Sequence, residues 1–176
     1  MIERIIIAGS GGQGIMLLGK ILATAAMAEN KFVTWLPAYG AEVRGGTAHC
    51  MVIISDKEIG SPFIDKADSL IIMNAPSLER FKNNISKGGL LVINSSLAKN
   101  YEDKKLNILQ GPFTDIAIKL GNIKVANMVA LGCFASQKKT VGLKTIEKVF
   151  ADIAPAGKKD LIEINVKALM EGSKIK

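Results

Sequence analysis

A glycine-rich run directly after the first apolar segment, residues 2–8, is the first feature of this sequence that could bind a ligand. It fits the pattern GxGxxG between a predicted strand and a predicted helix, and its candidate binding residues are Gly9, Gly11, Gly12, Gln13 and Gly14. Glycines at such a turn adopt positive φ and let the backbone approach a ligand, while free N–H groups at the start of the helix attract negative charge. The pattern therefore indicates a phosphate or carboxylate site, with a tight turn that binds nothing as the alternative.

A nicotinamide dinucleotide is disfavoured at this loop. It would require an acidic side chain about 20 residues further on, at the end of the second strand, to hold the ribose. The second predicted strand, residues 32–36, runs instead into Pro37 and Ala38. Glu29 is the acidic residue of this region, but it lies at the end of the preceding predicted helix and not at the carboxyl edge of the sheet.

A second loop, residues 37–46, follows the second predicted strand at the same edge of the sheet. Arg44 can hold a carboxylate or phosphate with two parallel hydrogen bonds, and Glu42 lies on the same side if the segment is extended. An ion pair between these two residues that only holds the loop is the alternative. We predict a ligand crevice between the two loops, and its candidate residues in the second loop are Tyr39, Gly40, Glu42, Arg44, Gly45 and Gly46.

The elements that position both loops alternate between strands and helices before the pattern becomes helical. We predict strands at residues 2–8, 32–36, 48–54, 69–73, 90–93 and 107–109, the last at an edge of the sheet. We predict helices at residues 14–29, 76–85, 115–120, 125–137, 143–153 and 159–170. Pro37 should end the second strand, and Gly88 and Gly89 should end the second helix. This order predicts a single domain, residues 1–176, with a three-layer α/β/α Rossmann-like fold, a mostly parallel sheet and extra C-terminal helices.

The composition argues against several classes of function. The two cysteines have no partner at CxxC spacing and there is one histidine, so we expect no metal site or iron–sulfur cluster in this chain. We find no signal peptide pattern and no apolar stretch long enough for a membrane span, and we expect a cytoplasmic protein without membrane contact. The net charge of +7 comes from dispersed lysines in residues 75–176, with three arginines and few aromatics in the chain, so we do not predict nucleic-acid binding.

Single residues add no catalytic group. His49 stands beside Cys50 without a second histidine or a nearby acid, so we do not predict a role in chemistry. Cys133 falls in an apolar predicted helix and should serve packing. Asn127 begins that helix and can hydrogen-bond a neighbouring loop as readily as a ligand. We therefore predict neither catalytic residues nor metal ligands.

Taken together, the two loops resemble those of a known family. A GxGGQG loop after the first strand and a PxYGxExRGG loop after the second are similar to the gamma subunit, or gamma domain, of the pyruvate/2-oxoacid:ferredoxin oxidoreductases. The similarity covers nearly the whole chain and includes Asp68 and residues 59–62, 74–77, 94–96 and 127–132. It is greatest to the 2-oxoglutarate type, with the 2-oxoisovalerate type next, although Ala38 stands where many relatives have serine.

The resemblance implies a subunit of an oxidoreductase that converts a 2-oxoacid, coenzyme A and oxidised ferredoxin into acyl-CoA, carbon dioxide and reduced ferredoxin. It implies alpha and beta partners with thiamine diphosphate and Mg, and a ferredoxin-like partner or subunit with iron–sulfur clusters. In that hetero-oligomer this chain is inactive alone and helps to enclose the active site and the coenzyme A path, with the Gly11–Gly14 amides and Arg44 as phosphate ligands. An independent nucleotide- or coenzyme A-binding Rossmann-like domain is the alternative.

Overall fold

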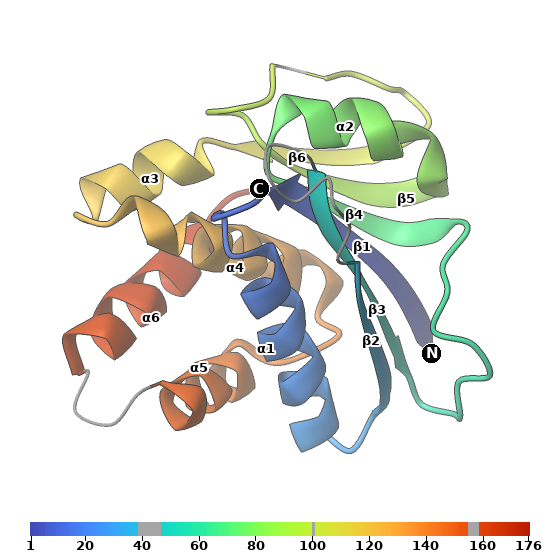
Figure 1. The fold of residues 1–176 in the computed structure, drawn as a ribbon, viewed down its shortest axis with the longest axis horizontal. Coiled ribbons are helices and arrows are strands. Elements are labelled where there is room, and N and C mark those ends of the chain that lie inside the picture. Colours follow the sequence, from blue (N-terminus) through green and yellow to red (C-terminus); the bar gives the residue numbers. More distant parts are fainter. Residues whose placement is uncertain (39–46, 100, 155–158) are drawn as a thin grey trace.

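The computed structural model describes residues 1–38, 47–99, 101–154 and 159–176. In this part of the chain a six-stranded sheet lies between helices on its two faces (Figure 1). The strands stand in the order β2-β3-β1-β4-β5-β6. Their bounds are β1 Ile2–Ser10, β2 Phe32–Ala38, β3 Thr47–Ser55, β4 Ala67–Ile72, β5 Ile85–Asn94 and β6 Asn107–Gly111.

The sheet that the described residues form is mixed, with three parallel and two antiparallel pairings. The pairs β1–β4, β4–β5 and β5–β6 are parallel, which confirms the mostly parallel sheet. Strand β3 pairs antiparallel with both β1 and β2 and is inserted between them. The predicted strand–helix–strand unit at the N-terminus is therefore present, but its two strands are not neighbours.

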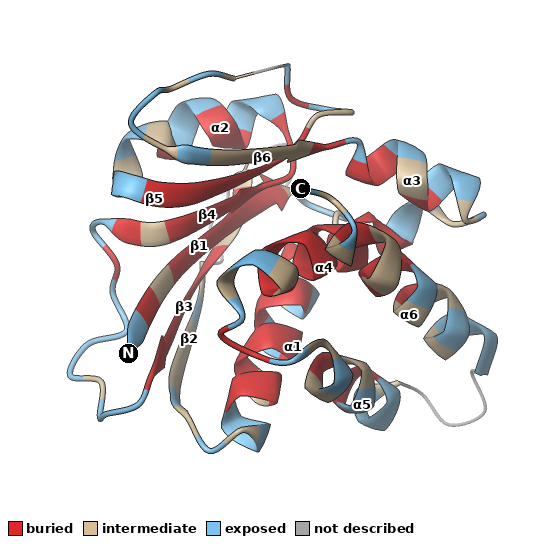
Figure 2. Ribbon diagram, turned by 180° about the vertical axis from the view of Figure 1, so that it is seen from behind, coloured by how far each residue is buried: buried red, intermediate tan, exposed pale blue. Residues whose placement is uncertain are grey.

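Among the described residues, five helices cover one face of the sheet and a single short helix covers the other (Figures 1 and 2). The short helix is α2, Ala75–Phe81, which continues into a 3₁₀ turn at Lys82–Asn84. The helices on the opposite face are α1 Ile15–Ala28, α3 Phe113–Lys119, α4 Ala126–Lys138, α5 Leu143–Ile153 and α6 Lys159–Ser173, with a 3₁₀ turn at Ile123–Val125 before α4. The three-layer prediction with extra C-terminal helices is confirmed.

Each central strand is buried on both faces. In β1, Ile5 and Ile7 pack into the core beneath α1 and α4, whereas Ile6 and Ala8 pack into the core beneath α2. A strand with both faces covered reads as a continuous apolar run and not as an alternating one. The isoleucine-rich start of the chain follows directly from this burial.

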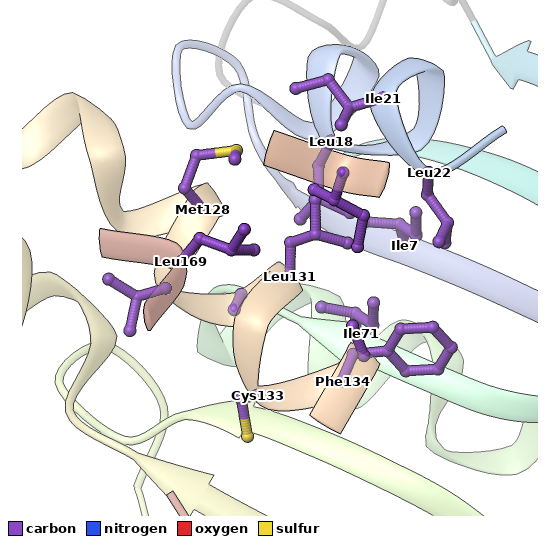
Figure 3. Close-up of a cluster of buried hydrophobic side chains, with 14 of the residues drawn as sticks. Ile7, Leu18, Ile21, Leu22, Ile71, Met128, Leu131, Cys133, Phe134 and Leu169 are labelled. Atoms are coloured by element: carbon purple, nitrogen blue, oxygen red, sulfur yellow. The ribbon is translucent and has the colours of Figure 1, made fainter. Parts of the chain in front are cut away.

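Helix α4 lies at the centre of the five-helix layer, and its residues from Ala126 to Ala135 are all buried. Figure 3 shows Leu131 and Phe134 of this helix next to Ile7 and Ile71 of the sheet. This packing holds the first turn of α4 close to the carboxyl edge of the sheet.

A close crossing joins α4 to α6. A Cβ atom added to Gly132 would overlap the carbonyl oxygen of Leu169, and one added to Gly172 would overlap the carbonyl oxygen of Val129. The two backbones therefore approach as closely as the missing side chains allow, and this contact fixes α6 against the central helix.

The residues predicted to end the second strand and the second helix lie inside strands instead. Pro37 lies inside β2, opposite Cys50 of β3, and an edge strand accepts proline because one side of it has no ladder to complete. Gly88 and Gly89 lie inside β5 and do not end a helix, since α2 already stops at Phe81. Gly88 has φ of 78°, and a Cβ on Gly89 would lie 2.6 Å from the Cγ1 of Ile85, so these glycines shape an irregular start of the strand.

Candidate functional site

The glycine loop lies at a topological switch point of the sheet. Neighbouring strands β1 and β4 are parallel, but β1 leads into α1 on one face whereas β4 leads into α2 on the other. The two connections diverge, and ligands of open α/β sheets bind in the crevice that such a divergence leaves at the carboxyl ends of the strands.

The glycines of the loop serve two different needs. Gly12 and Gly14 have φ of 87° and 70°, a backbone conformation that side chains other than glycine rarely adopt. Gly9 has an ordinary φ, but a Cβ there would lie 2.6 Å from the Cδ1 of Ile15 and 2.9 Å from the Cβ of Met73. The loop therefore needs glycine both for its turn and for close packing of α1 against the sheet.

Gln13 uses both ends of its amide to hold the loop. Its Oε1 accepts a hydrogen bond from the backbone N–H of Ser10 at 2.7 Å, and its Nε2 donates to the carbonyl oxygen of Met73 at 3.3 Å. The side chain thus bridges the ends of β1 and β4. Its predicted contact with a ligand stays a prediction, and its observed bonds position the loop.

Two further amides support the same region from the ends of the next strands. Asn74 follows β4, where its Nδ2 donates to the hydroxyl of Ser10 and its Oδ1 accepts from the backbone N–H of Ser77 at 3.0 Å, capping α2. Asn94 ends β5, is fully buried, and donates to the carbonyl oxygen of Met73 at 3.1 Å and to the hydroxyl of Thr114 at 2.8 Å. Asn74 and Asn94, which belong to segments that resemble the family, thus hold the carboxyl edge of the sheet together by hydrogen bonds.

Asn127 approaches the loop from the opposite side. Its Nδ2 donates to the carbonyl oxygen of Gly14 at 3.3 Å. The sequence left open whether Asn127 bonds a neighbouring loop or a ligand, and the bond to a loop is observed. The side chain is only 2% exposed, and its Oδ1 has no hydrogen-bond partner among the described residues. The first turn of α4 therefore rests directly on the start of α1.

The N-terminus of α1 opens onto a pocket of about 390 Å³. Its N-cap is Gly14, which offers no side chain to cap the helix. The N–H groups of the first turn can therefore donate hydrogen bonds to an anionic ligand. Ser10, the three loop glycines Gly11, Gly12 and Gly14, the first turn of α1 and Ala48 line the pocket. A smaller pocket of about 140 Å³ lies on the other side of Gly12, between the loop and Lys124.

Residues 39–46 of the second predicted loop lie outside the described residues, and the ligand roles of its candidate members stay predictions. These members are Tyr39, Gly40, Glu42, Arg44, Gly45 and Gly46. The residues at its two ends are described: Ala38 pairs with His49, and Thr47 pairs with Ser10. The hydroxyl of Thr47 also accepts a hydrogen bond from Arg80 of α2 at 2.6 Å. Both ends therefore lie at the edge of the sheet that carries the glycine loop.

Glu29, the acidic residue nearest to the expected ribose-binding position, has a structural role. Its Oε1 accepts a hydrogen bond from the backbone N–H of Gly142 at 2.8 Å, at the start of α5. It lies at the far end of α1 from the glycine loop. Glu29 therefore does not lie at the carboxyl edge of the sheet, where a ribose-binding acid would be needed.

Both thiols and the histidine belong to packed regions. Burial raises the pKa of Cys50 to about 12 against a smaller lowering by Trp35, and burial alone raises the pKa of Cys133 to about 12. Both thiols stay protonated near neutral pH and are poor nucleophiles. The ring of His49 packs against Phe81 with centroids 4.9 Å apart.

The described residues lack two features, a metal-binding cluster and a membrane-spanning helix. Their histidine, cysteine and carboxylate side chains do not gather in threes as a metal ion would require. Their helices also lack the combination of length and apolar character that a membrane crossing needs.

The fold and the loop define a Rossmann-like α/β domain with a glycine turn at its switch point. Residues 4–175 match the family model described as "Pyruvate ferredoxin/flavodoxin oxidoreductase". The chain belongs to this family, and the predicted resemblance is confirmed.

Several curated relatives are subunits of 2-oxoacid oxidoreductases. The ketoisovalerate oxidoreductase subunit VorA of Methanothermobacter thermautotrophicus is 38% identical over 173 residues, but the chain spans only 35% of that protein's length. The 2-oxoglutarate synthase subunit KorC of Methanocaldococcus jannaschii is 33% identical over 181 residues, covering 99% of this chain and 94% of the relative. The pyruvate/ketoisovalerate oxidoreductases common subunit gamma of Thermococcus kodakarensis is 31% identical, covering 93% of this chain and 91% of the relative.

Solved structures show the same fold. The gamma subunit of a keto/oxoacid ferredoxin oxidoreductase from Geobacter sulfurreducens has a TM-score of 0.85 and 28% identity, covering 98% of this chain and 96% of that one. The 2-oxoglutarate:ferredoxin oxidoreductase of Magnetococcus marinus, solved with 2-oxoglutarate, coenzyme A and succinyl-CoA bound, has a TM-score of 0.89. At 23% identity, and with this chain covering 30% of that one, the second likeness concerns the fold alone.

Sequence reasoning found the glycine loop but missed the residues that gather around it. Thr114 and Lys124 line the smaller pocket, yet nothing in their sequence neighbourhood marks them. Asn74 and Asn94 belong to segments that resemble the family, and only their hydrogen bonds show that they hold the edge of the sheet together.

Proposed function

We propose that this chain acts as the gamma subunit of a 2-oxoacid:ferredoxin oxidoreductase and binds part of coenzyme A at the glycine loop. The single observation that carries the proposal is the loop itself, because Gly12 and Gly14 turn the backbone with positive φ in front of an uncapped helix of 14 residues. That helix end opens onto the pocket of about 390 Å³. The rest of the machinery must come from other subunits.

Coenzyme A suits this loop chemically because it carries a pyrophosphate and a 3′-phosphate. Backbone N–H groups at a helix N-terminus bind phosphate oxygens without a cationic side chain. The relative from Magnetococcus was solved with coenzyme A bound, which makes this ligand the first to test. Arg44 of the second loop is our further candidate phosphate ligand.

The redox chemistry is assigned to partners. We propose that alpha and beta subunits bind thiamine diphosphate with Mg, and that a ferredoxin-like partner or subunit carries the iron–sulfur clusters. Cys50 and Cys133 are buried free thiols on different elements, which suits packing and not cluster ligation. We place the complex in the cytoplasm, where such thiols remain reduced.

The choice of 2-oxoacid has two candidates. We favour 2-oxoglutarate, because the likeness to KorC extends over nearly the full length of both chains. The alternative is 2-oxoisovalerate. It is supported by the identity to VorA, which is higher than that to KorC but extends over only 35% of the VorA chain. A relative named as a common subunit of two oxidoreductases indicates that a gamma subunit need not select the 2-oxoacid.

The test is purification of the tagged chain from its native source together with its partners. We expect the complex to reduce a viologen dye only when a 2-oxoacid and coenzyme A are both present. Comparing 2-oxoglutarate, 2-oxoisovalerate and pyruvate then identifies the substrate. Recovery of the chain alone, with full activity in fractions that lack it, would overturn the proposal.

The competing function is an independent nucleotide- or coenzyme A-binding domain, which the glycine loop by itself would support. Calorimetric titration of the isolated chain separates the two, since an independent domain must bind its ligand without partners. We expect no tight binding of NAD, because Glu29 is committed to Gly142.

A further inference from the structure

A third pocket, of about 310 Å³, lies beside the glycine loop among α1, α5, α6 and the 3₁₀ turn before α4. Its lining is mainly apolar, and the residues used below are Leu17, Val125, Phe150, Ile153, Leu161 and Asn165. Leu17, Ile153 and Leu161 are 41%, 39% and 36% exposed. Single exposed apolar residues are ordinary, but three that gather around one concave site are typical of a binding surface.

This pocket adjoins both pockets at the glycine loop. Leu17 lines it and also lines the pocket of about 390 Å³ at the start of α1. Lys124 lines it and also lines the pocket of about 140 Å³ next to Gly12. The apolar pocket and the pockets at the glycine loop are therefore adjacent, which allows one extended ligand to reach both.

Lys124 supplies positive charge between the two sites. Its side chain is exposed, and its ammonium makes no hydrogen bond or ion pair to any described residue. Its backbone is held, because its N–H donates to the Oδ1 of Asn122 at 3.0 Å. A lysine anchored in this way offers a point charge to a phosphate that bridges loop and pocket.

Asn165 gives the apolar pocket a polar edge. The side chain is 5% exposed, and its Nδ2 donates to the carbonyl oxygen of Leu161 at 2.7 Å. The amide oxygen is then available as an acceptor. A flat apolar heterocycle with an amino group matches a lining of Phe150, Leu17 and this acceptor.

We propose that the pocket among α1, α5 and α6 binds the adenine ring of coenzyme A, and that Lys124 contacts a phosphate next to it. The inference rests on the proposed function, which supplies the ligand, and adds where its nucleotide end lies. The thiol end then extends past the glycine loop, away from α5 and α6.

The test uses the purified complex and two variants. Lys124→Met removes the charge, and Ile153→Glu places a carboxylate in the mouth of the apolar pocket. The matched controls are Lys119→Met and Ile118→Glu, at exposed positions of α3 that line none of the three pockets. We expect each variant to raise the KM for coenzyme A about tenfold, the effect of losing one charge-assisted hydrogen bond or its equivalent, while both controls keep the wild-type KM.

A fragment of the ligand sharpens the test. Adenosine 3′,5′-bisphosphate carries the adenine and two phosphates without the thiol arm, so it should compete with coenzyme A in the wild-type complex and lose potency in both variants. Wild-type KM and inhibition in both variants would overturn the inference. Loss of partner subunits from the variants, with an unchanged KM in the remaining complex, would also overturn it and assign the pocket to a partner's side chain.

These failures are distinct from failure of the proposed function. If the wild-type complex shows no activity that depends on coenzyme A, the proposed function itself is wrong. If it does show that activity and the variants keep the wild-type KM, only the location of the adenine ring is wrong.

Discussion

The side-chain amide of Asn127 donates to the carbonyl oxygen of Gly14 at 3.3 Å, joining residues 113 positions apart in the chain. The contact sets the first turn of α4 against the N-cap of α1. It also leaves no room at Gly14, because an added Cβ would overlap the Nδ2 of Asn127. The stability of the glycine loop therefore depends on helix α4, which lies far from it along the chain.

The first prediction compares Gly12→Ala with Gly14→Ala. Both glycines have positive φ, so each substitution should cost about 1–2 kcal/mol of backbone strain. A Cβ at Gly12 enters open space, whereas one at Gly14 meets Asn127, so Gly14→Ala should be the more destabilising. Urea denaturation of both variants measures the difference.

The double variant Gly14→Ala, Asn127→Ala is the control for this comparison. Its loss in free energy of unfolding should be smaller than the sum of the losses in Gly14→Ala and Asn127→Ala, because removing the amide relieves the overlap. Equal destabilisation by Gly12→Ala and Gly14→Ala would contradict the packing described at Gly14.

The second prediction concerns Gln13→Glu, a change that keeps the shape of the side chain. The Nε2 that donates to Met73 becomes a carboxylate oxygen facing a carbonyl oxygen. We expect a loss of about 1–3 kcal/mol in the free energy of unfolding and weaker coenzyme A binding by the complex. Gln137→Glu, at an exposed site of α4, should change neither quantity, and equal behaviour of the two variants would show that Gln13 does not hold the loop.

The third prediction concerns the crossing of α4 and α6. Gly132→Ala and Gly172→Ala each bring a Cβ against a backbone carbonyl of the facing helix, which cannot move aside as a side chain can. We expect each to cost about 3 kcal/mol, measured by urea denaturation. Gly60→Ala, where a Cβ meets nothing within 4 Å, serves as the control and should be nearly neutral.

The fourth prediction concerns Cys50 and Cys133. Burial raises the pKa of each thiol from 9.0 to about 12, so neither should react with a thiol reagent at pH 8 until the protein unfolds. Between pH 9 and about pH 12 the thiols stay protonated in the folded state, whereas in the unfolded state they release their protons. Their contribution to stability is therefore complete below pH 9 and is lost as the pH rises from about 9 to 12.

Labelling kinetics and unfolding measurements at several pH values check this prediction. In Cys50→Ala and Cys133→Ala the remaining thiol should label at the rate of unfolding. Fast labelling of either thiol in the folded wild-type protein would show that the thiol is accessible and would contradict its burial.

The sequence by itself determined the local elements and the glycine turn. The isoleucine-rich start predicted a strand buried on both faces, and the helical periods predicted α1 and α5 almost to the residue. GxGxxG placed a glycine turn between strand and helix, since only glycine accepts the φ of Gly12 and Gly14. These features depend on residues close together in the chain, which is why a pattern could reveal them.

Only the tertiary structure decided which strands pair and what surrounds the turn. Strand β3 inserts between β1 and β2, so the switch point lies between β1 and β4, which the order of elements did not indicate. Pro37 and Gly88 sit within strands because an edge position and an irregular register accept them. Asn127 and Lys124 reach the loop from more than a hundred residues away, through the packing of α4 in the core, and no local pattern records such a contact.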